Sequence, residues 1–234
     1  MRIETIGAAR LYLGNCRDVM PLPEQIDALV TDQPYGMNYK INARSWNNEG
    51  LDGLKPFRME KRPGIFGDDQ PFDPAPFLVF PKVAFFGANK CSHALPAGGR
   101  WIVWDKRRDS KPDDHSDCEL IWTNIPGADR IHRQKWRGIV REGEENVSRS
   151  RKLHPNQKPV ALMTFVLEQI GAKAGDLIFD PFMGSGSTGV AALRMGMRFV
   201  GVEIDPSHFE IAYGRITASL ALADTSQERV IPHD

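Results

Sequence analysis

Cysteine is scarce in this chain. Only Cys16, Cys91 and Cys118 occur among 234 residues, and no two of them form a C-x-x-C pair. This spacing supports neither a disulfide framework nor a cysteine-based zinc site, and we interpret all three as small apolar side chains in or near the core. The low cysteine content indicates a reducing compartment, the cytoplasm.

Long apolar runs are also absent. No stretch approaches the roughly 18 apolar residues that a membrane helix needs, so no membrane partner is expected. Met1 to Arg10 lacks the basic start and apolar stretch of a secretory signal. A small acidic cluster around His115 is typical of a solvated turn, and no metal site is expected.

The chain has no overall excess of one charge. Thirty basic residues balance thirty acidic ones, and the sequence pI is about 7.0. Residues 130–158 depart from this balance, with nine basic and three acidic residues, a net charge of +6. Such a stretch is either a solvated loop or a surface that contacts phosphates.

Apolar patterning predicts strands that alternate with helices. Short buried runs predict strands at residues 10–14, 28–31, 83–87, 101–104, 120–123, 176–179 and 198–203. Helical spacing predicts helices at 159–170 and 188–195 and a last helix that starts after Asp205-Pro206, whereas the polar segment 36–76 is typical of a long loop. Alternation of this kind predicts an α/β fold with a mostly parallel sheet covered on both faces.

A glycine loop lies between the predicted strand 176–179 and helix 188–195. Gly184, Gly186 and Gly189 satisfy G-x-G-x-x-G, and the next strand ends in an acid, Glu203. The spacing suits a carboxylate that holds ribose hydroxyls while glycines let the backbone approach a ligand. These features indicate an adenosine-containing cofactor, without distinguishing a dinucleotide from S-adenosyl-methionine.

Three motifs together resemble the DNA amino-methyltransferases. Residues 180–189, DPFMGSGSTG, followed by FVGVEID at 199–205, look like the cofactor loop of that family; HPNQKP at 154–159 resembles its companion cofactor motif, and DQPY at 32–35 resembles its catalytic Asp-Pro-Pro-Tyr. The catalytic motif comes first, as in the permuted class called beta. The resemblance spans roughly residues 10 to 217.

The resemblance implies S-adenosyl-methionine as cofactor and assigns residues to it. The residues that would surround the cofactor are Asp180, Phe182, Gly184, Ser185, Gly186, Thr188, Glu203, Ile204 and Asp205, with His154, Asn156 and Lys158 closing the methionine pocket. Glu203 would bind the ribose hydroxyls, and Ile204 or Asp205 would lie beside the adenine. For Lys158 a plain surface role is the competing interpretation.

The resemblance likewise assigns Asp32, Gln33, Pro34 and Tyr35 to catalysis on a flipped-out base. An exocyclic amino group is a poor nucleophile because the ring shares its lone pair, and two acceptors on its hydrogens would free that pair. The Asp32 carboxylate and the Gln33 carbonyl would be those acceptors, and Tyr35 would stack on the base. Aspartate at position 32 favours adenine N6 over cytosine N4.

Gln33 departs from the family, in which proline is usual. A main-chain carbonyl survives a side-chain change, but proline stiffens the turn and restricts the residue before it. A catalytically weak or inactive DNA-binding relative is therefore one alternative. Cytosine-N4 methylation, methylation of RNA or of a protein amide, and an NAD-dependent oxidoreductase are the others.

The expected partner is double-stranded DNA, methylated at specific sites as in restriction-modification. The basic residues expected to contact it are Arg133, Lys135, Arg137, Arg149, Arg151 and Lys152. Trp136 could wedge between bases, although packing is an equal alternative. The recognition sequence, a cognate nuclease and a homodimer are left open.

The expected architecture is one doubly wound, Rossmann-like methyltransferase domain over residues 1–234. Its expected parts are a catalytic half at about 10–106, a small target-recognition insertion at about 107–153, and a cofactor-binding half at about 154–217.

Overall fold

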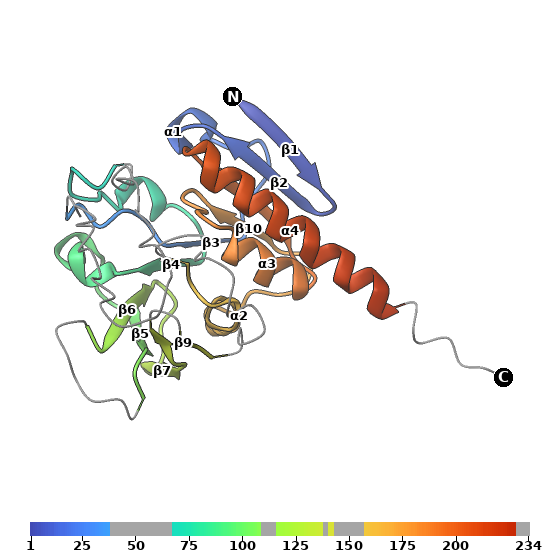
Figure 1. Ribbon diagram of the computed structural model, residues 1–234. Coiled ribbons are helices and arrows are strands. Elements are labelled where there is room, and N and C mark those ends of the chain that lie inside the picture. Colours follow the sequence, from blue (N-terminus) through green and yellow to red (C-terminus); the bar gives the residue numbers. More distant parts are fainter. Residues whose placement is uncertain (38–66, 109–115, 138–139, 143–156, 228–234) are drawn as a thin grey trace, which may run out of the picture.

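A computed structural model describes residues 1–37, 67–108, 116–137, 140–142 and 157–227 (Figure 1). Nine strands form the main sheet: β1 (Arg2–Ile6), β2 (Ala9–Leu13), β3 (Ala28–Thr31), β4 (Val83–Phe86), β5 (Arg100–Asp105), β6 (Cys118–Thr123), β7 (Arg130–Arg133), β10 (Leu177–Asp180) and β11 (Arg198–Glu203). A separate small hairpin pairs β8 (Trp136–Arg137) with β9 (Val140–Arg141).

The helices are α1 (Cys16–Val19), α2 (Val160–Gln169), α3 (Ser187–Arg194) and α4 (Pro206–Gln227). Single 3-10 turns lie at η1 (Ala75–Phe77), η2 (Ala88–Lys90) and η3 (Ser92–Ala94). Asp205 caps α4 as expected, because its Oδ1 accepts hydrogen bonds from the Ser207 and His208 amides at 2.7 and 3.0 Å. In the described residues no helix is long and apolar enough to cross a membrane.

The sheet order is β1-β2-β11-β10-β3-β4-β6-β5-β7. Neighbours from β2 to β4 run parallel, and β6 is the one antiparallel strand in the interior, paired with β4 and β5. The mostly parallel α/β sheet is therefore confirmed. β3 pairs directly with β10, so strands from the two ends of the sequence meet in the middle of the sheet.

Each face of the sheet carries its own apolar core. Along β3, Ala28 and Val30 belong to the cluster that includes α2, α3 and α4, whereas Leu29 belongs to the opposite cluster with Phe77 and Phe85. This alternation follows from the two-residue period of a strand. The three longer helices therefore cover one face (Figure 1), and α1 with the turn η1 packs on the other.

The direction of the strands brings several strand ends together at one edge of the sheet. The carboxyl ends of β3, β4, β5, β10 and β11 lie at the same edge of the sheet, and the amino end of β6 lies there too because β6 runs antiparallel. Ligands of open α/β sheets bind outside the carboxyl ends of the strands. The candidate site is therefore expected at this edge.

All the strands and helices expected from the sequence are present, and several others were not anticipated. β1, α1, β7 and the β8–β9 hairpin carried no clear apolar period. Within the segment 107–153, β6 and β7 are strands of the main sheet. The division into a catalytic half, a recognition insertion and a cofactor half stays a prediction.

Candidate active site

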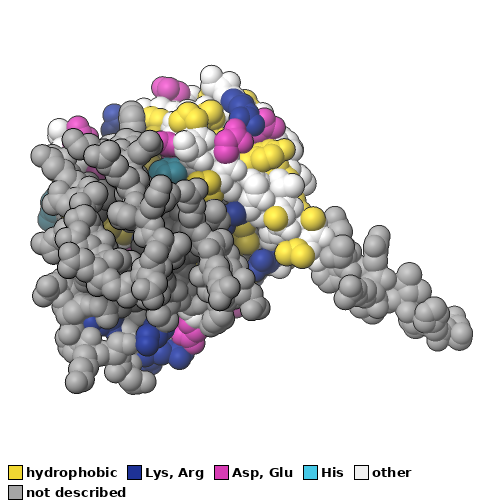
Figure 2. Space-filling model, viewed as in Figure 1, with side chains coloured by type: hydrophobic (Ala, Val, Ile, Leu, Met, Phe, Trp, Pro, Cys, Tyr) yellow, Lys and Arg dark blue, Asp and Glu magenta, His cyan; other side chains and the backbone are white. Residues whose placement is uncertain are grey.

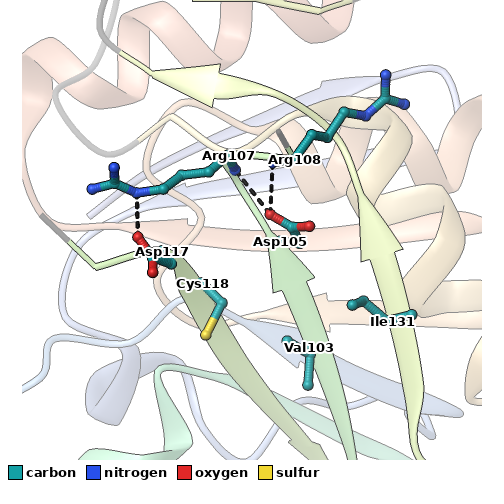
Figure 3. Close-up of a pocket in the computed structure, with 7 residues that line it drawn as sticks. All are labelled: Val103, Asp105, Arg107, Arg108, Asp117, Cys118 and Ile131. Atoms are coloured by element: carbon teal, nitrogen blue, oxygen red, sulfur yellow. Dashed lines mark hydrogen bonds and ion pairs between the residues drawn. The ribbon is translucent and has the colours of Figure 1, made fainter. Parts of the chain in front are cut away.

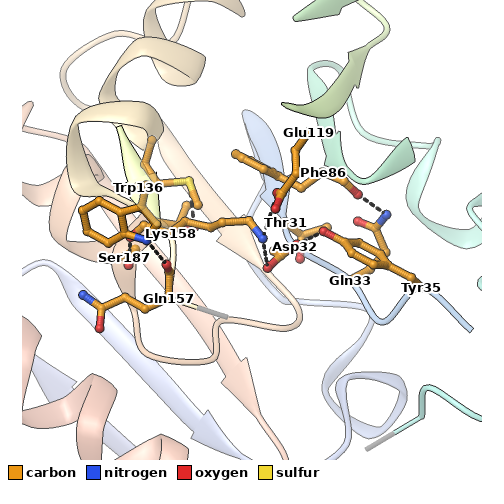
Figure 4. Close-up of polar contacts among 12 residues, drawn as sticks. Thr31, Asp32, Gln33, Tyr35, Phe86, Glu119, Trp136, Gln157, Lys158 and Ser187 are labelled. Atoms are coloured by element: carbon orange, nitrogen blue, oxygen red, sulfur yellow. Dashed lines mark hydrogen bonds and ion pairs between the residues drawn. The ribbon is translucent and has the colours of Figure 1, made fainter. Parts of the chain in front are cut away.

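The carboxylate of Asp32 lies just beyond the end of β3. Its Oδ1 accepts a hydrogen bond from the Tyr35 hydroxyl at 2.7 Å, and its Oδ2 lies 2.8 Å from Lys158 Nζ (Figure 4). The Asp32 side chain keeps 20% of its surface exposed, whereas that of Lys158 keeps 7%. An ion pair thus joins the DQPY motif to the lysine of HPNQKP, and its two residues are 126 positions apart in the sequence.

Lys158 has a second carboxylate partner. Its Nζ lies 3.1 Å from Oε2 of Glu119, and the other oxygen of Glu119 lies 3.1 Å from Nζ of Lys106. Glu119 follows Cys118 at the amino end of β6, and Lys106 follows the last residue of β5. Two carboxylates and two ammonium groups therefore alternate in a row that starts at Asp32.

Burial and opposite charges act against each other on the pKa values in this row. Burial raises the pKa of Asp32, and the charge of Lys158 only partly opposes that rise. Burial lowers the pKa of Lys158, but the charges of Asp32 and Glu119 outweigh it and hold the pKa well above its ordinary value. For Glu119 the two lysines outweigh burial, and its pKa is lowered.

Gln33 is fixed by its own side chain. Its Nε2 donates a hydrogen bond to the Phe86 carbonyl oxygen at the end of β4, 2.6 Å away, and the residue is only 3% exposed. A tether of this kind restrains the turn that follows β3. Gln33 therefore supplies by hydrogen bonding some of the restraint that proline would supply by its ring.

Tyr35 lies against the backbone that follows β4. A Cβ on Gly87 would collide with the Tyr35 ring, and Gly87 has a φ of +60°, so glycine is needed here for both space and conformation. The backbone N–H groups of Tyr35 and Met37 both donate to Oδ1 of Asp68, at 3.0 and 3.2 Å. These contacts fix the turn through Pro34 and Gly36 in addition to the hydrogen bond of Gln33.

Asp180, at the end of β10, is held by hydroxyl groups. Thr31 and Thr188 each donate a hydrogen bond at 2.7 Å, one to each carboxylate oxygen, and the Phe182 amide donates at 3.1 Å. Burial raises its pKa to about 6, against the effect of these donors. Asp180 thus locks the glycine loop to β3, directly before Asp32.

Glu203, at the end of β11, holds the other side of the glycine loop. Oε2 accepts from the Gly184 amide at 2.9 Å and Oε1 from the Asp205 amide at 2.8 Å. Burial raises its pKa to about 7 in spite of these donors. Each carboxylate oxygen has a further lone pair, so Glu203 can still accept hydrogen bonds from a bound ligand.

The loop itself combines tight turns with close packing. Gly186 has a φ of +76° and precedes α3, and Ser185 is bound through its carbonyl and hydroxyl oxygens by Arg215 of α4 at 2.6 and 2.9 Å. A Cβ on Gly189 would come within 2.6 Å of the Phe199 ring, so this third glycine serves helix–strand packing. Ile204 is partly buried beside Glu203.

The start of α2 is fastened to the glycine loop. Ser187 Oγ donates to the Lys158 carbonyl oxygen at 2.8 Å, and the Trp136 indole N–H donates to the Gln157 carbonyl oxygen at 3.0 Å (Figure 4). Trp136 also packs against the core, which favours the packing role over a wedge between bases. His154 and Asn156 of the same motif lie outside the described residues.

The expected DNA contacts are only partly described. Arg133 is 60% exposed at its side chain and lies at the end of β7, 3.9 Å from Asp105, and Lys135 follows it. Of Arg137 only the backbone in β8 is described, and Arg149, Arg151 and Lys152 lie outside the described residues. Elsewhere the surface is mixed: Arg2 pairs with Glu4 and Glu210, and basic and acidic side chains lie together over β1 and α4 (Figure 2).

One pocket of about 370 Å³ lies on β5, β6 and β7, and its lining residues include the chain neighbours of Lys106 and Glu119 (Figure 3). Its charged residues satisfy one another: Arg107 pairs with Asp117, and the Asp105 carboxylate accepts from the Arg107 and Arg108 amides at 3.0 and 2.9 Å. Arg108 also pairs with Glu142 at 3.0 Å. These contacts cap the end of β5 and engage the charged side chains of the pocket with one another.

No group of His, Cys, Asp and Glu residues suited to a metal ion occurs among the described residues.

Comparison with known proteins shows which family the sequence is similar to. Residues 100–214 match the N6/N4 methyltransferase family, described as DNA methylase. Just under half of this chain is thus similar to the DNA methylases of that family.

Two relatives illustrate the match. The Type II methyltransferase M2.DpnII of Streptococcus pneumoniae is 33% identical over 120 residues, which cover 50% of this chain and 41% of that enzyme. M2.LlaDCHI of Lactococcus lactis subsp. cremoris is 32% identical over 118 residues, covering 49% and 40%. The matched segment is thus less than half the length of these methyltransferases.

Solved structures of methyltransferases share the fold over nearly the whole chain. The M1.HpyAVI–SAM complex superposes with a TM-score of 0.51 and 22% identity, covering 88% of this chain and 99% of that one. The PvuII DNA methyltransferase, described as cytosine-N4-specific, gives 0.56 and 16%, covering 94% and 92%. At these identities the likeness establishes the Rossmann-like fold alone.

Proposed function

We propose that this chain transfers a methyl group from S-adenosyl-methionine to the N6 amino group of a flipped-out adenine in DNA. The observation that carries the proposal is the shared edge of the sheet. There Thr31, next to Asp32, is hydrogen-bonded to Asp180 of the glycine-loop strand at 2.7 Å. The carboxylate that would accept a hydrogen from the target amino group is thereby fixed close to the proposed cofactor loop. Methyl transfer between two bound molecules requires such fixed positions.

The donor set of the loop suits this cofactor. Glu203 offers a carboxylate to ribose hydroxyls at the end of β11, while Asp180, Phe182, Gly184, Ser185, Gly186 and Thr188 form the loop, and Ile204 and Asp205 lie beside it. The cofactor supplies a methyl group on a positively charged sulfur. Lys158 forms an ion pair with Asp32, so we assign it a role on the catalytic side of the site as well.

The chain's own residues would activate the amino group. The Asp32 carboxylate and the Gln33 carbonyl accept its two hydrogens, which frees the nitrogen lone pair. That pair forms the new bond to the methyl carbon as the carbon–sulfur bond breaks, with its electrons staying on sulfur. One amino proton passes to Asp32 and from there to water. Tyr35, held between Gly87 and Asp32, would stack on the base.

Double-stranded DNA is the proposed partner, with Arg133 and Lys135 as phosphate contacts near the site. Adenine is favoured because Asp heads the motif. Cytosine N4 is the second candidate, since one structural neighbour is described as cytosine-N4-specific. The family match argues against an NAD-dependent oxidoreductase, which would leave the Asp32–Lys158 pair without a role.

The test is incubation with S-adenosyl-methionine and unmethylated DNA, digestion to nucleosides and mass spectrometry. We expect N6-methyladenine from the wild type and none from Asp32→Ala, which should still bind cofactor because Lys158 keeps Glu119 as a partner. Glu210→Ala, which removes an exposed carboxylate of α4, is the control and should stay active. Detection of N4-methylcytosine would mean that the target base is cytosine and not adenine. The absence of both methylated products would refute the proposed function.

A further inference from the structure

Glu119 is an acid of the site that lies outside the catalytic motif at 32–35 and the cofactor motifs at 154–159 and 180–205. It lies at the amino end of β6, with its side chain 22% exposed, and both of its oxygens face a lysine. The Lys158 ammonium lies between Glu119 and Asp32, at 3.1 and 2.8 Å (Figure 4). One cation is thus shared by the proposed catalytic carboxylate and a second carboxylate.

We propose that Glu119 is a positioning residue for Asp32: by sharing the Lys158 ammonium, it keeps Asp32 a strong acceptor for the amino hydrogen of the target base. The inference rests on the proposed function for its catalytic meaning. Glu119 contacts Lys158 and Lys106, and it acts on Asp32 through Lys158.

Lys158 and Glu119 have opposite effects on Asp32 as a hydrogen-bond acceptor. An ammonium bound to Asp32 alone would stabilise its negative charge and so weaken it as a hydrogen-bond acceptor and base. Glu119 forms an ion pair with the same ammonium at 3.1 Å, so it offsets part of that positive charge and adds a negative charge nearby. Lys106, on the far oxygen of Glu119, keeps Glu119 ionised.

The groups that face Asp32 come from every neighbouring element. Tyr35 donates from the same turn, Lys158 from the start of α2, Glu119 from β6 with Lys106 behind it, and Asp180 lies on β10. Burial raises the pKa of Asp32, Lys158 lowers it and Glu119 raises it. Removing the Glu119 charge should therefore lower the pKa of Asp32.

A carboxyl carbon NMR titration of the full chain, labelled at aspartate, measures this directly. In Glu119→Gln we expect the pKa of Asp32 to fall by about one unit. Lys106→Met removes the competing cation and should shift it upward. Glu168→Gln, which removes an exposed charge from α2, is the matched control and should leave it unchanged. An unchanged or raised pKa in Glu119→Gln would overturn the proposal.

The ammonium of Lys158 reports whether Glu119 acts through it. Its ¹⁵Nζ signal should be visible in the wild type, because both carboxylates protect its protons, and should broaden by faster exchange in Glu119→Gln. A shifted Asp32 together with an unaltered Lys158 signal would mean that Glu119 acts by its charge alone, which contradicts positioning through Lys158.

Kinetics connect the shift to turnover. We expect Glu119→Gln to lower the single-turnover methylation rate about tenfold, with the low-pH limb of the rate profile displaced to lower pH and cofactor affinity unchanged. A rate and profile like the wild type's would overturn the catalytic meaning. The NMR titration needs no turnover, so absence of methylation by the wild type would refute the proposed function separately.

Discussion

The hydroxyl of Thr31 donates a 2.7 Å hydrogen bond to Oδ1 of Asp180, and both residues are buried. This bond joins the last residue of β3 to the last residue of β10 and thus fixes Asp32 relative to the glycine loop. Its energetic weight depends on the charge of Asp180, because hydrogen bonds to an ionised group are stronger than those to a neutral one.

Thr31→Val should therefore destabilise the fold in a pH-dependent way. The pKa of Asp180 is raised to about 6, so the folded state holds a proton below that pH and the carboxylate is charged above it. We expect the free energy of unfolding to fall by about 1–3 kcal/mol at pH 8 and by less at pH 5. Urea denaturation at both values measures it.

Thr5→Val, at an exposed position of β1, is the matched control and should change stability little at either pH. Equal losses for Thr31→Val at pH 5 and pH 8 would show that the hydroxyl does not stabilise the ionised form of Asp180.

The tether from Gln33 to Phe86 predicts how activity responds at position 33. Gln33→Leu keeps the bulk but removes the amide, so the turn loses its hold on β4, and we expect the methylation rate to fall about tenfold, the cost of a misplaced reacting group. Gln33→Pro restrains the turn by its ring and should keep most of the activity.

Single-turnover rates with saturating cofactor measure this, and Gln25→Leu at an exposed position is the control. Wild-type activity in Gln33→Leu would mean that the tether is dispensable. In that case the expectation of a weakened enzyme, drawn from the missing proline, would lose its structural basis as well.

The sequence contained most of this arrangement in its strand and motif patterns. Buried apolar runs predicted β3, β4, β5, β10 and β11, and the acids at Asp32, Asp180 and Glu203 each follow such a run. In a parallel sheet, those positions meet at one edge without any further information. The shared edge of the two motifs was therefore predictable from local patterns.

Glu119 was not predictable in that way. It lies at the start of a strand, and only the antiparallel direction of β6 brings that start to the active edge. Strand direction depends on tertiary pairing, which local periodicity does not encode. The contacts of Lys158 and Gln33 also depend on tertiary structure. The motif of Lys158 suggested the methionine pocket and did not specify its ion pair with Asp32. The hydrogen bond from Gln33 to Phe86 likewise does not follow from the residue type alone.

The raised pKa of Glu203 predicts that cofactor affinity depends on pH. Ribose hydroxyls donate to the ionised carboxylate, so the complex should have a lower Glu203 pKa than the value of about 7 in the free protein, and binding should release a proton. Below that pKa, affinity for S-adenosyl-methionine should fall by up to about tenfold per pH unit.

Calorimetry in buffers of different ionisation enthalpy measures both effects. The cofactor's own amino group titrates in a similar range, so Glu203→Gln is the control that isolates the protein's share. That variant should bind more weakly and lose the Glu203-dependent part of the pH response. Proton uptake on binding, or a wild-type affinity in Glu203→Gln, would contradict the ribose role.

Arg133 and Lys135 predict a salt-dependent contribution to DNA binding. Arg133 is 60% exposed, and at 3.9 Å its pairing with Asp105 is weak, so its guanidinium can approach phosphates beside the active edge. Lys135 follows two residues later and is partly exposed. The double variant Arg133→Ala, Lys135→Ala should bind DNA more weakly at all sequences. The magnitude of the slope of log affinity against log salt should decrease by about 2, one for each lost phosphate contact.

Lys173→Ala is the matched control, because it removes a charge of the same sign. Lys173 lies on an exposed turn before β10, at the opposite edge of the sheet, so the slope should stay unchanged. An unaltered slope in the double variant, or an equal decrease in Lys173→Ala, would place the DNA on another surface.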